Sequence, residues 1–372
     1  MIFLNYIKVC PLNHNLSTKI LIIGLFLHIS AIMIKKRLCG STVDEIFQLI
    51  ASSNYSYSHA LLISNSIYKK RLSDYAQNPK IPKKLREDLI STADSGLFKP
   101  VAFTTSVDNT VKYLFRNEVG MEYETVFLPG NKRNTVCVST QAGCRMGCPF
   151  CVTGSYGFHG DLSAGEIINQ IISLPEAGKI THVVFMGMGE PLDNLGNILK
   201  ACQILTAEWG LAISCRNVTV STVGITPGIE IFLRDCECNL TLSLHSPFSE
   251  ERKSVVPVEK KYPVHEIIEI MRNYPVKKKR RLSIAYVMIH NVNDTDEHLE
   301  GLKALLHGST IRINLLPYHP VINDISVSSS EERMHFFKHN LVVSGISASI
   351  RKSRGADISA ACGLLASGLK LK

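Results

Sequence analysis

Six short runs of β-branched and apolar residues recur along the middle of the chain, and they restrict its fold more than any other feature. The runs are TVCVST, HVVFMG, NVTVST, LTLSL, LSIAYVMI and IRINLLP. Helix-like stretches alternate with them at 163–174, 194–207, 226–234, 263–274 and 294–306. Strands that alternate with helices form a parallel sheet. The sequence therefore predicts an α/β fold that binds its ligands at the carboxyl ends of the strands.

Three cysteines follow the first run in the segment GCRMGCPFC, where Cys144, Cys148 and Cys151 have the spacing C-x3-C-x2-C. Iron–sulfur clusters are usually held by four cysteine thiolates. A set of three can therefore hold three irons of a cubane and leave the fourth iron open to a small molecule. The alternatives are three reduced cysteines in a loop, or part of a zinc site.

The other cysteines do not complete a zinc site by their spacing. Zinc sites usually combine a C-x2-C pair with a second ligand pair downstream. Here Cys236 and Cys238 are one residue apart at the entry to a predicted buried strand, and Cys202 and Cys215 occur singly. Eleven cysteines without a regular pairing pattern also argue against a secreted disulfide scaffold and favour a reducing compartment.

Further polar and glycine residues follow the predicted strands. Gly187 to Glu190 come after the second run, Ser221 lies at the end of the third, Ser243 to His245 follow the fourth, and Asn314 lies near the end of the sixth. Because the carboxyl ends of parallel strands meet at one edge, these residues are expected to converge with the cysteines. Taken singly, each has a plainer interpretation as a turn, capping or strand-end residue.

These motifs together resemble a known family. The segments CVSTQAGCRMGCPFCVTGSYGFHGDLSAGEIINQI, FMGMGEPLDN, VTVSTVGITPGI, LTLSLHSPFSEER, INLLPYHP and SRGADISAACGLLA occur in the order found in radical S-adenosylmethionine (radical SAM) RNA methyltransferases of the RlmN/Cfr type. The resemblance covers most of the chain from about residue 110 onward. It implies a partial (β/α)6 TIM-like barrel, with a small N-terminal helical accessory domain and a C-terminal catalytic loop.

The resemblance also implies a cofactor site. One 4Fe-4S cluster would be bound by Cys144, Cys148 and Cys151, and two molecules of S-adenosylmethionine would be used per turnover. Gly189 and Glu190 match the motif that holds the amino group of S-adenosylmethionine, where a carboxylate can pair with an ammonium. The other matching residues contact the ribose, the carboxylate or the adenosine; they are Ser221, Ser243, Leu244, His245 and Asn314.

Two further cysteines are catalytic by the same resemblance. Cys362 would accept a methyl group as a thiolate nucleophile, and the adenosyl radical would then remove hydrogen from that methyl group. After the carbon adds to adenine, Cys137 would attack the sulfur, form a disulfide with Cys362 and release the product; thiol exchange would reset the pair. Glu124 matches the proposed proton acceptor, and its neighbour Glu122 is a weaker candidate. By themselves, both cysteines would be interpreted as ordinary buried or loop cysteines.

The implied substrates are an adenine of 23S rRNA and the adenine next to the anticodon in certain tRNAs, both methylated at carbon 2. The Cfr branch methylates carbon 8 and confers antibiotic resistance, and the shared cysteines do not distinguish the two. The wording of SRGADISAACG and GEPLDN is nearer the carbon-2 branch. A non-catalytic iron–sulfur RNA-binding protein would not need Cys362 or Glu190, and a radical enzyme for small molecules would not need a basic helical domain.

The expected organisation has five parts. Residues 1–32 are interpreted as an upstream extension outside the fold, and 33–100 as the helical RNA-binding accessory domain. A strand-rich linker is expected at 101–130, the radical SAM core at 131–350 and the segment with the catalytic cysteine at 351–372. The apolar run 20–34 is shorter than the roughly 20 residues of a membrane span, so an anchor is the less favoured alternative.

Charge agrees with an RNA substrate without requiring one. The chain has 41 Lys and Arg against 32 Asp and Glu, a formal net charge of +9, and a mildly basic chain suits a polyanionic partner. The densest basic run, KKKRR at 277–281, can contact phosphates or form a solvated turn. We expect a cytoplasmic monomer without membrane contact, reduced by flavodoxin or ferredoxin. The basic residues of the predicted helical domain are Lys69, Lys70, Arg71, Lys80, Lys83, Lys84 and Arg86.

Overall fold

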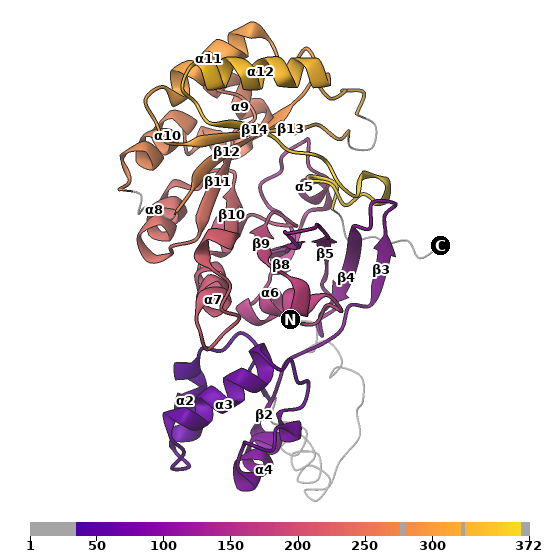
Figure 1. Ribbon diagram of the computed structural model, residues 1–372, viewed down its shortest axis with the longest axis vertical. Helices are drawn as coiled ribbons and strands as arrows, with labels where there is room; N and C mark the ends of the chain where they lie inside the picture. The colour runs from indigo at the N-terminus through magenta and orange to yellow at the C-terminus, as the bar shows by residue number, and fades with distance from the viewer. Residues whose placement is uncertain (1–34, 276–279, 321–323, 366–372) are drawn as a thin grey trace, which may run out of the picture.

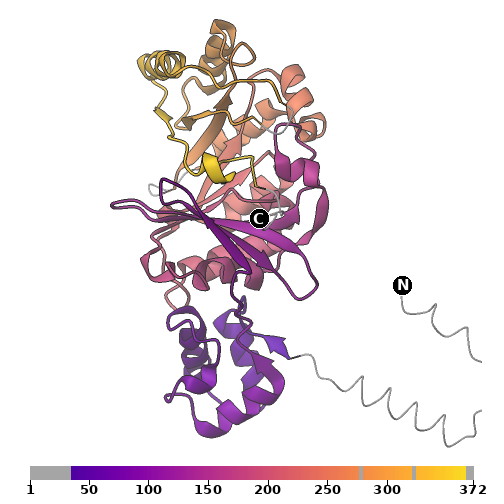
Figure 2. The same ribbon diagram turned by 90° about the vertical axis from the view of Figure 1, so that its right-hand side faces the viewer.

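A ten-stranded sheet forms the centre of the computed structural model, which describes residues 35–275, 280–320 and 324–365 (Figures 1 and 2). Seven neighbouring strands are parallel. Six of them confirm the predicted runs, and β14 extends the sheet beyond β13 as a seventh. The parallel strands are β6 (Thr135–Cys137), β9 (His182–Phe185), β10 (Val218–Thr222), β11 (Asn239–Ser243), β12 (Leu282–Met288), β13 (Arg312–Pro317) and β14 (Ala348–Ile350).

The helices predicted between these strands are present, and each packs an apolar face against the sheet. In α6, for example, Ile167, Ile168 and Ile171 are buried, while Ser163 and Glu166 form a capping box at its start. The helices of the barrel are α5 (Val152–Tyr156), α6 (Ala164–Ile172), α7 (Leu195–Thr206), α8 (Thr226–Asp235), α9 (Ser249–Val255), α10 (Val264–Asn273), α11 (Asp296–Leu306) and α12 (Glu331–Val343).

The interval 101–130, expected as a strand-rich linker, forms strands that are part of the main sheet. It forms β3 (Ala102–Thr105), β4 (Val111–Arg116) and β5 (Glu122–Leu128), and β5 pairs antiparallel with β6 of the main sheet. The physical reason lies in β5, where five consecutive residues from Tyr123 to Phe127 are buried. A strand covered on both faces belongs inside a sheet. The described sheet therefore has a parallel part and an antiparallel edge.

The N-terminal part is a small helical unit below α6 and α7 (Figure 1). The Glu45 carboxylate pairs with Lys200 of α7 at 2.6 Å, and the Ser64 hydroxyl donates to the Trp209 carbonyl at 2.9 Å. Among its basic residues, Lys70, Arg71, Lys80, Lys83 and Lys84 are exposed. The unit consists of β1 (Lys36–Arg37), α2 (Val43–Ala51), α3 (Tyr57–Tyr68), α4 (Lys83–Thr92) and β2 (Ala93–Asp94).

Some expectations fall outside the described residues. They are the interpretation of residues 1–32, the apolar run 20–34 and the lysines of the KKKRR run. Among the residues that are described, we find no helix that is both long and apolar enough to cross a membrane.

Candidate active site

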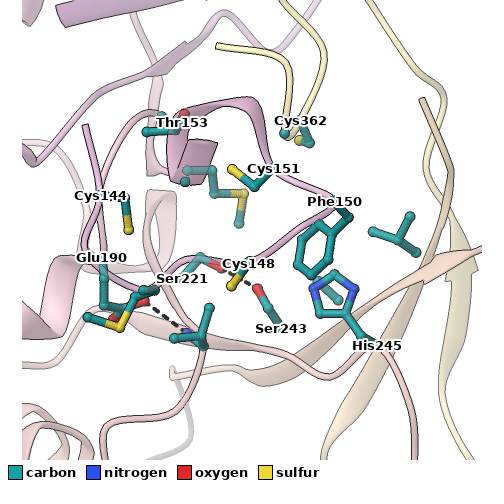
Figure 3. Close-up of a pocket in the computed structure, with 18 of the residues that line it drawn as sticks. Cys144, Cys148, Phe150, Cys151, Thr153, Glu190, Ser221, Ser243, His245 and Cys362 are labelled. Carbon is teal, nitrogen blue, oxygen red and sulfur yellow. Dashed lines mark hydrogen bonds between the residues drawn. The ribbon is translucent and has the colours of Figure 1, made fainter. Parts of the chain in front are cut away.

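The three cysteines of the C-x3-C-x2-C motif lie on one loop that a short hairpin closes. β7 (Gln141–Gly143) and β8 (Phe158–Asp161) pair antiparallel, and the Cys144 amide donates to the Gly157 carbonyl at 2.9 Å. The loop between them carries Cys148 and Cys151, and the three sulfur atoms face a common space (Figure 3). The loop follows β6, at the carboxyl end of the parallel strands, as predicted.

The donor set fits an iron–sulfur cluster. Burial raises the pKa values of Cys144 and Cys148 to about 12, so both stay protonated unless a cationic group stabilises their thiolates. The three sulfurs are also not packed together as ligands of one ion. In the described chain, the group of three possible ligands lying within 4.8 Å of one another is a different set of cysteines. Ligands spread around a shared space suit a multi-iron cluster better than zinc.

Most of the predicted site residues converge on one pocket beside this loop. The pocket encloses about 1130 Å³ including its open mouth and lies at the carboxyl ends of the parallel strands, where ligands of such sheets bind. Its walls include a C-terminal cysteine more than 200 residues from the loop. The predicted residues that line it are Cys144, Cys148, Cys151, Gly189, Glu190, Ser221, Ser243, His245 and Cys362.

Glu190 is the most strongly held polar side chain of the pocket. It is buried, and its carboxylate accepts three hydrogen bonds: from the Leu192 amide at 3.0 Å, the Thr222 hydroxyl at 2.7 Å and the Val223 amide at 2.9 Å. Thr222 is the last residue of the strand β10 and Val223 follows it, whereas Glu190 follows β9. The carboxylate is thus fixed between two strand ends, with lone-pair capacity left for one cationic donor. Sequence reasoning did not single out Thr222.

The ionisation of Glu190 predicts a pH dependence of stability. Burial raises its pKa from 4.5 to about 7, against the three hydrogen bonds. Between these values the folded protein keeps a proton that the unfolded chain has lost, so stability falls as pH rises through this window. Compared with Glu190→Gln, the wild type is expected to lose about 3 kcal/mol of unfolding free energy across it. Urea denaturation over that pH range measures the unfolding free energies of both proteins. The prediction is contradicted if the unfolding free energies of the wild type and Glu190→Gln change with pH in parallel. The exposed substitution Glu87→Gln is the control and should follow the wild type.

Gly189 and His245 both take backbone conformations that few residues adopt. Gly189 has φ of +97°, and an added Cβ would lie 2.7 Å from the Gln141 amide nitrogen. Only glycine therefore fits at this strand end. His245 has φ of +64°, and burial lowers its pKa to about 3, so the ring is neutral. Its ring centroid lies 3.9 Å from that of Phe150, which lines the pocket from the cysteine loop (Figure 3).

A buried arginine that was not predicted from the sequence joins the chain segments after β10 and β11 that border the pocket. Arg252 donates to the carbonyls of Leu244 at 2.9 Å and Ser243 at 3.0 Å, and it also bonds Val223 and Glu259. These contacts tie the ends of β10 and β11 together. Leu244 itself is fully buried and is not among the residues lining the pocket. Its side chain packs in the core, which leaves its backbone as the part nearest the site.

Asn314 and Glu124 also lie away from the pocket wall. The Asn314 side-chain oxygen accepts from Ser349 at 2.9 Å and from Arg351 at 3.0 Å, so the amide is engaged within the chain. Glu124 is fully buried on β5 and pairs with Lys112 at 3.4 Å. In the described conformation neither side chain faces the space next to the cysteine loop.

Cys362 reaches the pocket because the C-terminal segment is bound to the cysteine loop. The Val152 amide donates to the Gly363 carbonyl at 2.8 Å, and the Thr153 hydroxyl donates to the Leu365 carbonyl at 2.5 Å. Cys362 is exposed and lies beside Cys151 (Figure 3). Cys137, at the end of β6, is 8% exposed, and burial followed by the charge of Cys362 raises its pKa. The two predicted catalytic cysteines are therefore close enough to influence each other.

The β3–β4 hairpin forms a clamp on the same segment. The Asp357 carboxylate accepts from the Ser106 hydroxyl at 2.6 Å and from the Val107 amide at 3.1 Å. Asp357→Ala is expected to lower the catalytic rate at this pocket by on the order of tenfold, because the segment that carries Cys362 loses its fixed position. Single-turnover assays measure the effect, with iron content unchanged. Exposed Asp296→Ala on α11 is the control; equal turnover in both variants would contradict the positioning role.

Comparisons with known proteins show which family the chain resembles. Residues 138–302 match the family described as the Radical SAM superfamily. A protein of Phocaeicola vulgatus named "Probable dual-specificity RNA methyltransferase RlmN" is 41% identical over 338 residues, covering 91% of this chain and 97% of the relative. The "Dual-specificity RNA methyltransferase RlmN" of Geobacter sulfurreducens is 36% identical over 326 residues, covering 88% and 91%.

A solved structure has the same fold. The radical SAM methyltransferase from Sphaerobacter thermophilus has a TM-score of 0.82 and 37% sequence identity, covering 88% of this chain and 98% of that chain. The match spans more than the barrel alone. It confirms the predicted fold class of a partial α/β barrel with its additional terminal parts.

Proposed function

Because the chain belongs to the RlmN family of RNA methyltransferases, within the radical SAM superfamily, we propose that it methylates carbon 2 of adenine in RNA. The proposed targets are one adenine of 23S rRNA and the adenine next to the anticodon in certain tRNAs. The observation that carries the proposal is the position of Cys362, which lines the same pocket as Cys144, Cys148 and Cys151. A radical site with a protein nucleophile at its wall suits methyl transfer to a carbon that is not itself nucleophilic.

The proposed cofactors are a 4Fe-4S cluster on Cys144, Cys148 and Cys151, and S-adenosylmethionine. When bound, they supply methyl groups and the one-electron chemistry that removes a hydrogen atom from a methyl group. Glu190 would accept the ammonium of S-adenosylmethionine, and Gly189 lets the backbone approach closely. Ser221 and Ser243, whose hydroxyls lie 3.4 Å apart, would bind its polar groups. The Phe150 and His245 rings cover an adjacent part of the pocket and help exclude water.

The protein's own steps concern Cys362 and Cys137. Cys362 must lose its proton to accept a methyl group. Although the residue has exposed surface, desolvation by the surrounding chain and then the charge of Cys151 raise the pKa of its thiol, so a base or the substrate has to assist. Once the methyl carbon is bonded to adenine, the Cys137 thiolate attacks the Cys362 sulfur. The carbon–sulfur bond breaks, its electron pair stays on the carbon, and that carbon takes up a proton to become the methyl group of the product. The two sulfurs form a disulfide, which a reductant must later return to two thiols.

Removal of the adenine ring proton is assigned to Glu124. Because this carboxylate is buried away from the pocket, it must first become accessible. Lys112, which pairs with Glu124, also lies 3.4 Å from the Ser359 carbonyl of the C-terminal segment. Movement of the C-terminal segment would therefore disturb the ion pair of Lys112 and Glu124 and make the Glu124 carboxylate more accessible.

The helical unit would bind the folded RNA through phosphates. Five of its seven predicted basic side chains are exposed, and the unit is anchored on α7 through the ion pair of Glu45 and Lys200. Binding of this type weakens strongly as salt rises. Flavodoxin or ferredoxin is the proposed electron donor, and the proposed setting is a monomer in the cytoplasm.

Reconstitution tests the proposed function. The cluster-loaded protein is incubated with unmodified 23S rRNA fragments, deuterated S-adenosylmethionine and a low-potential reductant, and the nucleosides are separated by mass spectrometry. Labelled 2-methyladenosine supports the proposal, and the Cys362→Ala variant should give none. Labelled 8-methyladenosine would instead support the carbon-8 alternative, and absence of any methylated adenine in wild-type reactions that cleave S-adenosylmethionine would contradict both.

A further inference from the structure

A second group of cysteines lies at the opposite end of the parallel strands from the active site. Cys238 comes directly before β11, Cys236 caps the C-terminus of α8, and Cys202 lies in α7. Their sulfur atoms all lie within 4.8 Å of one another, and their side chains are 2%, 9% and 1% exposed for Cys202, Cys236 and Cys238. Spacing in the sequence had given no reason to join them, because the three come from three separate elements.

The separation of these sulfurs suits a single metal ion. A tetrahedral zinc ion with Zn–S bonds near 2.3 Å holds its thiolates about 3.8 Å apart. Sulfurs within 4.8 Å need only small side-chain adjustments to reach that arrangement. Buried thiolates at this distance repel one another, so they need a cation or shared protons between them. The group is also buried, as expected of a closed structural site.

A fourth cysteine lies close by, outside the set whose sulfurs are all within 4.8 Å of one another, so it would have to move toward the group to bind the same ion. Cys215 begins the short helical turn Cys215–Asn217 before β10, and it packs against the buried core. The Asn239 side chain, next to Cys238, donates to the Arg216 carbonyl at 2.8 Å and ties this turn to the start of β11. Arg216 directly follows Cys215 and Asn239 directly follows Cys238, so this hydrogen bond holds the chain segments of the two cysteines together.

An arginine supplies compensating charge. Arg280 donates to the Cys238 carbonyl at 2.9 Å and the Leu233 carbonyl at 2.8 Å, and it also bonds the Cys236 carbonyl. Four thiolates around Zn²⁺ carry a net charge of −2, and a guanidinium fixed beside two of them offsets part of it. Arg280 belongs to the KKKRR run, and its guanidinium bonds backbone carbonyls of this region, including those of Cys236 and Cys238.

We propose that Cys202, Cys236 and Cys238, with Cys215 as fourth ligand, bind one structural zinc ion. The ion would join α7, the end of α8 and the beginnings of β10 and β11 at the amino-terminal face of the barrel. Residues at that face of such barrels serve stability and not catalysis. The site is independent of the iron–sulfur cluster, whose three cysteines lie at the other end of the strands.

Metal analysis of the full-length, anaerobically purified protein tests the proposal. Zinc is expected close to one ion per chain in addition to the cluster iron, and it should resist dialysis against a chelator. Cys236→Ser should lose the zinc, whereas Cys39→Ser, a buried cysteine elsewhere, should keep it. Cys215→Ser should bind zinc but release it to the chelator; unchanged retention would contradict the four-thiolate assignment.

Cobalt gives a readout that does not depend on the variants folding. Zinc-depleted wild type given Co²⁺ should show the intense thiolate-to-cobalt absorption and the visible bands of a tetrahedral site. Absence of both zinc and these bands would overturn the proposal. So would intact mass spectrometry showing a disulfide within the group in anaerobically purified protein, because oxidised sulfurs cannot bind the ion.

Discussion

Cys137→Ala is expected to trap the protein covalently on its RNA and to lower release of methylated adenine by on the order of a hundredfold or more. Cys137 lies at the end of β6, where burial raises its pKa and the charge of the Cys362 thiolate raises it further. Without the attacking sulfur, the bond between the Cys362 side chain and the adenine carbon has no partner to displace it. The variant should therefore consume one RNA per chain and stop.

Denaturing gels and mass spectrometry of ribonuclease-treated protein detect this adduct. Its mass should correspond to a nucleotide plus one carbon on the peptide that contains Cys362. Cys39→Ala, which removes another buried thiol, should turn over as the wild type does. Normal release of free product by Cys137→Ala would contradict the resolving role, even if the rest of the proposed function were correct.

Cys148→Ser is expected to abolish cluster binding and all cleavage of S-adenosylmethionine. Cys148 is the most buried of the three loop cysteines, and its pKa is raised to about 12 without a metal. A hydroxyl in its place is a far poorer ligand for iron than a thiolate. Iron and sulfide content and the yield of 5′-deoxyadenosine measure the loss, and circular dichroism shows whether the fold is retained.

The comparison for this variant is Cys39→Ser, which should keep full iron and full cleavage activity. Cys148→Ser with wild-type iron content would contradict the assignment of the cluster to the loop. Removing the iron from the wild type with a chelator should abolish cleavage of S-adenosylmethionine. Reconstitution with iron and sulfide should restore cleavage in the wild type but not in Cys148→Ser.

The parallel strands could be predicted because each carries its own signal. TVCVST or LSIAYVMI has the composition of a buried strand wherever it lies, and the helices between them set the parallel direction. The place of β3 to β5 could not be predicted in the same way. Their alternation indicated strands, but pairing of β5 with β6 depends on contacts that local sequence does not encode.

The site followed from the sequence where a residue sits next to a strand end. Glu190 and Ser243 are such residues, and they line the pocket. Arg252 was missed because its function rests on carbonyls of two other segments, and a serine–glutamate-rich helix gives no sign of a buried guanidinium. The group of Cys202, Cys236 and Cys238 was missed for the same reason: its members meet only in the folded chain.

The most direct test of the account is the methylation state of adenines in cells that lack this gene. Nucleosides from 23S rRNA and from tRNA of the deletion strain are compared with those of the parent strain by mass spectrometry. 2-Methyladenosine is expected to disappear from the deletion strain and to return with the wild-type gene but not with Cys362→Ala. Unchanged 2-methyladenosine in the deletion strain would contradict it.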